Sequence, residues 1–133
     1  MDANAFYRMV DRTAQFHSRE KAKRVTAAVI HALRDRLTPE EALQARAQLP
    51  HPIKQVWDDG DDVDRRALRL DLEQFHARVM VEAGLTSAWE ARWATLAVFA
   101  ALKEALTPGE AQDVMSQLPK DLKEEWVEAQ AST

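Results

Sequence analysis

The chain has 133 residues, of which 46% are hydrophobic and 30% are charged, and it contains three glycines and no cysteine. This composition predicts one compact helical domain over residues 1–133 and excludes disulfides, thiol catalysis and cysteine-ligated metals. The net charge of −4 argues against nucleic-acid binding, which normally needs a basic face. The longest apolar stretch, residues 93–102, is far shorter than the ~20 residues that cross a bilayer, so no membrane span is expected. The N-terminal sequence lacks the features of a secretory signal, which predicts a cytoplasmic protein.

The sequence aligns with itself, without a gap, at an offset of 69 residues. Residues 32–42, ALRDRLTPEEA, match residues 101–111, ALKEALTPGEA, and Phe6 and Val10 match Phe75 and Val79. Apolar residues recur at spacings of three and four in both copies, which is typical of amphipathic helices. We therefore predict an all-α fold of about eight helices with pseudo-two-fold symmetry. Repeat one covers residues 2–57, a linker covers 58–66, and repeat two covers 71–126.

The first predicted helix of each copy covers residues 2–15 and 71–83. In the second copy, Gly84 followed by Leu85 is typical of a helix C-cap, and Gln15 is expected to take the same place in the first copy. The second and longest helix begins at residues 18 and 87 and ends at residues 37 and 106. Ser87, with Glu90 three residues later, predicts a capping box.

The third predicted helix begins with Thr38-Pro39 and Thr107-Pro108, each followed by a glutamate that completes a capping box. Pro50 and Pro119 are expected to stop this helix, and a short fourth helix carries Trp57 or Trp126, which are matched and therefore predicted to be core. The segment 58–64 is rich in aspartate around one glycine. Its spacing does not fit a calcium-binding loop, because residues 55 and 57, Gln and Trp, would have to be ligands. A solvated linker is expected there.

The duplicated pattern resembles a known bacterial family labelled domain of unknown function 2267. The residues that carry the resemblance are Phe6 and Val10 in the first helix and 48–50, Gln-Leu-Pro, after the third, together with their partners 75, 79 and 117–119. The resemblance extends over nearly the whole chain. It implies a helical fold of two repeats, and it implies no activity, cofactor or site residue.

Chemical signatures are scarce in this sequence. His17, His31, His51 and His76 show no metal-ligand spacing, and none has a histidine at the equivalent position of the other copy. Serine nucleophile motifs and glycine-rich phosphate loops are missing too. We therefore expect no catalytic residue, no cofactor and no metal site. The competing interpretation is an enzyme or small-ligand binder that uses a polar pocket between the repeats, involving His31 or His76.

The two copies differ in character along one face of the second helix. Glu20, Arg24 and Ala27 in the first copy are replaced by Trp89, Trp93 and Leu96 in the second. Two interpretations are open. Either the linker, with Val63 and Leu68, or another helix covers this apolar face, or the face is an exposed patch that binds a second copy or an unknown protein partner. We favour a non-enzymatic cytoplasmic protein-interaction module. A third possibility, nucleic-acid binding, would use the basic residues Arg19, Lys21, Lys23 and Arg24.

Overall fold

The computed structural model describes residues 1–62 and 64–131, and this part of the chain contains eight α-helices. The all-α fold expected from the sequence is therefore confirmed. None of these described helices is long and apolar enough to cross a membrane. The helices are α1 (Ala3–Ala14), α2 (Arg19–Arg36), α3 (Pro39–Ala47), α4 (His51–Asp58), α5 (Leu72–Ala83), α6 (Ala88–Ala105), α7 (Pro108–Ser116) and α8 (Lys120–Glu128).

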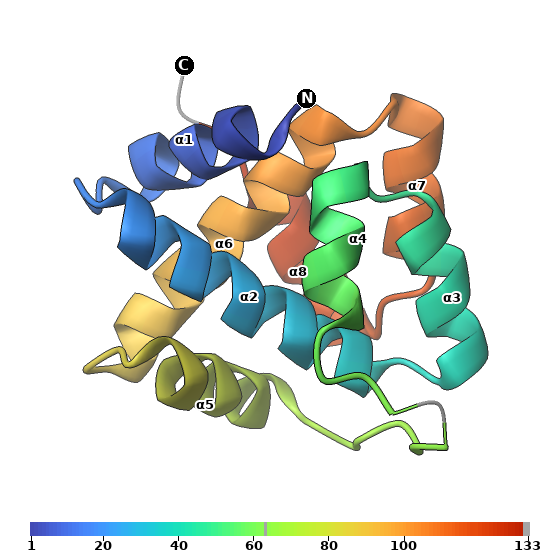
Figure 1. Cartoon of the computed structure of the whole chain (residues 1–133). Coiled ribbons are helices and arrows are strands. Elements are labelled where there is room, and N and C mark those ends of the chain that lie inside the picture. The colour runs from blue at the N-terminus through green and yellow to red at the C-terminus, as the bar shows by residue number, and fades with distance from the viewer. Residues whose placement is uncertain (63, 132–133) are drawn as a thin grey trace.

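The two long helices, α2 and α6, contact each other at the centre of the molecule (Figure 1). Helix α1 packs against α6, and α5 packs against α2, so the first helix of each half lies on the long helix of the other half. The short helices gather at one end, where α4 packs on α2, α8 packs on α6, and α3 meets α7. The two halves are therefore joined by helix packing and not by the linker alone.

Helix starts follow the local capping signals closely. The side chains of Thr38 and Thr107 accept hydrogen bonds from Glu41 and Glu110, whose carboxylates return to the threonine N–H groups, so both predicted capping boxes are present. The box predicted at Ser87 is only half formed. Ser87 Oγ accepts from the Glu90 N–H at 3.1 Å, but the carboxylate of Glu90 instead accepts from Thr86 N–H at 3.3 Å and pairs with a lysine of α2. The cross-helix ion pair takes the side chain away from the cap.

The C-termini of α1 and α5 end in the same left-handed conformation. Gly84 has φ of 68°, and the next N–H, of Leu85, donates to Met80 O at 2.9 Å. Gln15 has φ of 58°, and Phe16 N–H donates to Asp11 O at 3.2 Å. This arrangement satisfies carbonyls that have no partner within the helix. The C-cap expected from Gly84-Leu85 is confirmed, and Gln15 adopts it without being glycine.

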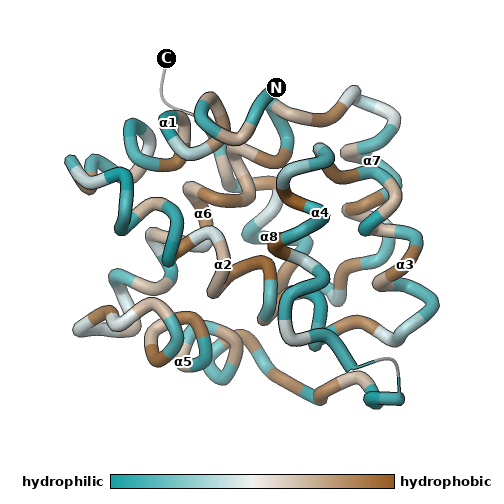
Figure 2. The backbone as a smooth tube through the Cα atoms, in the orientation of Figure 1, coloured by the Kyte–Doolittle hydropathy of each residue, from teal (hydrophilic) through white to brown (hydrophobic). Residues whose placement is uncertain are grey.

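The core is built around small residues of the two long helices. Ala22, Ala28, Ala91 and Ala97 are all buried, which lets neighbouring helices approach closely. Larger side chains fill the space between the layers, and the matched Trp57 and Trp126 are 1% and 3% exposed, as expected for core residues. Figure 2 shows hydrophilic and hydrophobic segments alternating along the helices, as expected when each helix buries one face.

Candidate interaction surface

The N-terminal half of α6 carries the side chains that the sequence singled out. Trp89 and Trp93 lie one turn apart, and Leu96 follows on the same face. Trp89 is 69% exposed, Trp93 is 43% exposed, and Leu96 is half-buried. Leu68, one of the residues considered as a cover, instead donates its backbone N–H to Asp35 O at the end of α2, and Val63 lies outside the described residues. The indoles at the start of α6 therefore keep much of their surface open.

Neighbouring groups hold both indoles in place. Trp93 Nε1 donates a hydrogen bond to Ala14 O at 3.0 Å. Ala14 is the last residue of α1, so its carbonyl has no partner in the helix ladder and the indole satisfies it. The guanidinium of Arg92 lies 5.8 Å from the centre of the Trp89 ring, within the range of a cation–π contact. Both indoles therefore have a contact within the molecule that fixes their position.

A cleft of about 240 Å³ opens beside Trp93. It is lined by Thr13 of α1, by Trp93, Leu96 and Ala97 of α6, and by residues 128–130 at the end of α8. Small-molecule sites typically enclose ~300–1,000 Å³, and this cleft lies just below that range. Sequence reasoning identified the α6 wall of the cleft but not the walls from α1 and α8.

The rim and the α8 wall of this cleft are fixed by charged side chains. Glu128 accepts two hydrogen bonds from Arg92, at 2.6 and 2.8 Å. Lys103 donates to the carbonyls of Trp126 and Ala129, both at 2.8 Å, which secures the C-terminus of α8. Burial lowers the pKa of the Lys103 ammonium from its ordinary value, because desolvation disfavours the charged form. The partly buried ammonium of Lys103 therefore holds the α8 wall of the cleft in place.

The equivalent face of α2 is polar and tied to other helices. Arg24 Nε donates to Ala83 O at 3.5 Å, so this side chain satisfies the end of α5 as Trp93 satisfies the end of α1. His31 contacts Glu82 through Nδ1 at 2.7 Å and the carbonyl of Val56 through Nε2 at 2.8 Å. This face is exposed only at its start and bridges α2, α4 and α5 further along.

The basic residues considered for nucleic-acid binding also make contacts within the molecule. Lys21 pairs with Glu90 at 3.3 Å and lies over the ring of Phe16. Lys23 lies 5.7 Å from the centre of the Tyr7 ring. Lys21 is thus paired with a carboxylate and Lys23 lies over an aromatic ring of α1, which does not favour the broad basic face that phosphate binding needs.

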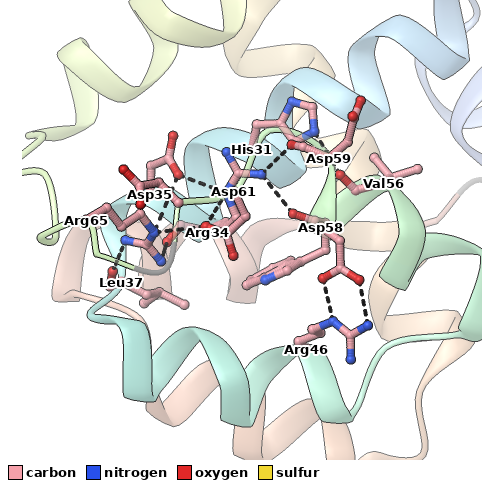
Figure 3. Close-up of polar contacts among 12 residues, drawn as sticks. His31, Arg34, Asp35, Leu37, Arg46, Val56, Asp58, Asp59, Asp61 and Arg65 are labelled. Carbon is pink, nitrogen blue, oxygen red and sulfur yellow. Dashed lines mark hydrogen bonds and ion pairs between the residues drawn. The ribbon is translucent and has the colours of Figure 1, made fainter.

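A second polar cluster lies where the linker meets the end of α2 (Figure 3). Arg34 is 5% exposed and donates to the carbonyls of Trp57 and Asp59, at 2.8 and 2.7 Å, and to Asp35 at 2.8 Å. Arg65 donates to the carbonyls of Leu37 and Arg34, both at 2.8 Å. Arg34 and Lys103 are both basic at the same repeat position, a signal in the sequence that could have revealed this role.

Asp35 is the acceptor that several arginines of this cluster share. It pairs with Arg34 and Arg78 at 2.8 Å and lies 3.9 Å from Arg65. Burial acts to raise the pKa of Asp35, but the hydrogen bonds from Arg34 and Arg78 outweigh it and hold the pKa below the ordinary value. The linker, expected to be solvated, is therefore fastened to α2 through Arg65.

A neighbouring pocket of about 340 Å³ is lined by Pro39, Ala42, Leu43, Arg46, Trp57, Asp58, Asp61, Asp62 and Arg65.

The competing interpretation requires a polar pocket between the halves, and a groove of about 370 Å³ lies between α3 and α7. It is lined by exposed or half-buried side chains, among them Gln48, Asp113 and Gln117. His31 and His76 are not part of this lining. His76 is instead buried with Glu125, its Nε2 lying 2.8 Å from the carboxylate. In the part of the chain that the structure describes, no cluster of three or more His, Cys, Asp or Glu residues could hold a metal ion.

The chain matches a known sequence family over most of its length. Residues 3–125 match a family described as "Uncharacterized conserved protein (DUF2267)". The resemblance stated from the repeated residues is therefore confirmed. No curated protein matches the chain.

Proposed function

We propose that this chain, a member of the DUF2267 family, is a protein-interaction module. Its recognition surface is formed by Trp89, Trp93 and Leu96. One observation carries the proposal. Two of the four tryptophans are deeply buried, whereas the other two are exposed on one helix face beside a cleft of side-chain size. Exposed, rigid aromatic side chains next to a pocket are typical of the centre of protein interfaces.

The size and chemistry of the cleft favour a protein partner over a small substrate. Its volume of about 240 Å³ suits one apolar side chain, and its floor includes the buried Ala97 and Ala129. The carboxylate at its rim, Glu128, already accepts two hydrogen bonds from Arg92. Catalysis needs a positioned group that is able to exchange a proton or attack a substrate, and the one carboxylate among the described lining residues is already paired with Arg92.

The proposal also includes the origin and location of the protein. The helices of the second half begin 69 residues after those of the first, which supports a duplicated four-helix unit. A chain without cysteine suits the reducing bacterial cytoplasm, where we propose that it acts.

The test compares the wild type with Trp89→Glu, which introduces the residue found at the equivalent position 20 of the first copy. Val81→Glu is the matched control, because Val81 is 77% exposed on α5. Proteins captured by the immobilised wild type are identified, purified and titrated by calorimetry. We expect Trp89→Glu to weaken binding by at least ~tenfold, as for a residue at the centre of an interface, and Val81→Glu to have no effect. Equal binding by all three chains would contradict the proposal.

The groove between α3 and α7 leads to a different result if it is the binding site. A small ligand in that groove would raise the melting temperature of the wild type and of Trp89→Glu equally, because Trp89 lies outside the groove. Gln48→Ala would remove that shift.

A further inference from the structure

The exposed α6 face carries both a protruding side chain and a cleft. Trp89 protrudes from the first turn of α6, and the cleft begins one turn later, between Trp93 and Ala97. A surface that presents a projection and a matching recess side by side can bind a copy of itself across a two-fold axis, because each projection then enters the recess of the other copy. This condition is not met on α2, where Glu20 and Arg24 take the places of the two tryptophans.

We propose that the occupant of the cleft is Trp89 of a second copy, so that the chain forms a symmetric homodimer through α6. This inference rests on the proposed function and names its partner. Residues 89 and 97 are eight positions apart, about 12 Å along a helix. The two-fold axis therefore passes near Trp93, the two α6 helices cross there in opposite directions, and the two Trp93 side chains meet at the centre.

The charges on this face are compatible with such a pairing. Arg92 lies beside Trp89, and Glu128 stands at the rim of the cleft. When Trp89 enters the cleft of the other copy, its Arg92 approaches Glu128 of that copy, so opposite charges meet on both sides of the axis. Arg92 and Glu128 already pair within each copy, and dimerisation would bring the two pairs side by side across the axis.

The exposed area predicts the strength of the dimer. At exposed fractions of 69% and 43%, the two indoles offer roughly 200–300 Å² per copy, against the ~800 Å² per partner of a standard interface. We therefore expect a weak dimer, with a dissociation constant in the micromolar range, which forms and separates with concentration.

The test measures mass in solution by sedimentation equilibrium between about 5 and 500 μM, a range chosen around the micromolar affinity expected for a small interface. The wild type is expected to rise from the monomer mass of 15.1 kDa towards twice that value. Trp89→Glu should remain a monomer throughout, and Val81→Glu should behave as the wild type. Trp89 is largely exposed, so this variant keeps its fold, which far-UV circular dichroism checks.

A second variant tests the centre of the interface. Trp93→Arg introduces the residue found at position 24, whose side chain makes the equivalent hydrogen bond to a helix end. We expect it to stay folded and to weaken dimerisation by at least ~tenfold, as for a central aromatic residue. A wild type that stays monomeric up to 500 μM overturns the homodimer, as does a Trp89→Glu chain that dimerises like the wild type. The capture experiment then decides the proposed function separately, because it detects other proteins.

Discussion

Gln15 and Gly84 occupy equivalent helix ends with nearly the same backbone angles, yet only one of them is a glycine. A left-handed conformation costs a residue with a side chain about 1 kcal/mol more than it costs glycine. Gln15 is exposed, so its side chain gains little from packing there. The first copy therefore carries local strain that the second copy avoids.

Exchanging these two residues gives opposite effects. We predict that Gln15→Gly raises the free energy of unfolding by about 0.5–1 kcal/mol, and that Gly84→Gln lowers it by about 1 kcal/mol. No atom lies within 4 Å of a Cβ added at Gly84, so the loss reflects the backbone angle and not a clash. Urea denaturation of both variants measures the two changes. Effects of the same sign would show that the left-handed angles do not control these positions.

Asp35 links stability to pH through its arginine partners. Its folded-state pKa is lower than its ordinary value of 3.8, so the ion pairs contribute fully above that pH and are lost as the pH falls through the folded-state pKa. We predict that Asp35→Asn lowers the free energy of unfolding by about 2 kcal/mol at pH 7, and that urea denaturation shows this difference shrinking as the pH falls below 3.8.

Asp58 provides the control for this prediction. Hydrogen bonding to Arg46 lowers the pKa of Asp58 as well, but this pair is exposed to solvent. Asp58→Asn should therefore cost less than about 1 kcal/mol at pH 7. A similar loss in both variants would contradict a special role for the cluster around Arg34.

At the scale of the helices, sequence patterns predicted the elements better than their contacts. Thr38, Thr107 and Gly84 set helix ends through groups only a few residues away, and such signals can be recognised without the fold. The half-formed cap at Ser87 could not be predicted, because Glu90 is drawn to Lys21, which lies 69 positions away in the sequence. Local rules fail where a distant side chain competes for the same group.

The candidate surface shows the same contrast between local signals, which the sequence reveals, and long-range contacts, which it does not. Trp89, Trp93 and Leu96 were identified because one repeat could be compared with the other. The walls supplied by Thr13 of α1 and by the end of α8 could not be inferred, because they depend on how helices far apart in the chain pack together. Periodicity shows which face of a helix is apolar, but it does not show which helix covers it.

The C-terminus of α8 depends on Lys103, and its loss should affect the cleft. We predict that Lys103→Met lowers the free energy of unfolding by about 1–3 kcal/mol, because the carbonyls of Trp126 and Ala129 lose their donor. Thermal denaturation measures this change. Hydrogen exchange should show faster opening at residues 126–130 than in the wild type, while α4 stays unchanged. Unchanged protection at α8 would mean that other contacts hold this end.

For the whole molecule, packing of the first helix of each half on the long helix of the other makes each half depend on the other. Helix α1 packs on α6 and α5 packs on α2, so unfolding one half exposes the core face of the other. Proteins of this size with one shared core usually unfold in a single transition. The halves are therefore expected to behave as one cooperative unit although each has its own set of four helices.

Calorimetry and two variants, each with one tryptophan replaced, test this cooperativity. Trp57 reports on α4 in the first half and Trp126 on α8 in the second, and both are buried. We predict coincident fluorescence and circular dichroism transitions in Trp57→Phe, whose remaining tryptophans all lie in the second half, and in Trp126→Phe, which keeps Trp57 as the reporter of the first half. The calorimetric enthalpy of the wild type should equal the van't Hoff value, at about 90 kcal/mol near 60 °C for a chain of this length. Two separate transitions, each with about half that enthalpy, would mean that the halves fold independently and that the α1–α6 and α2–α5 contacts contribute little to stability.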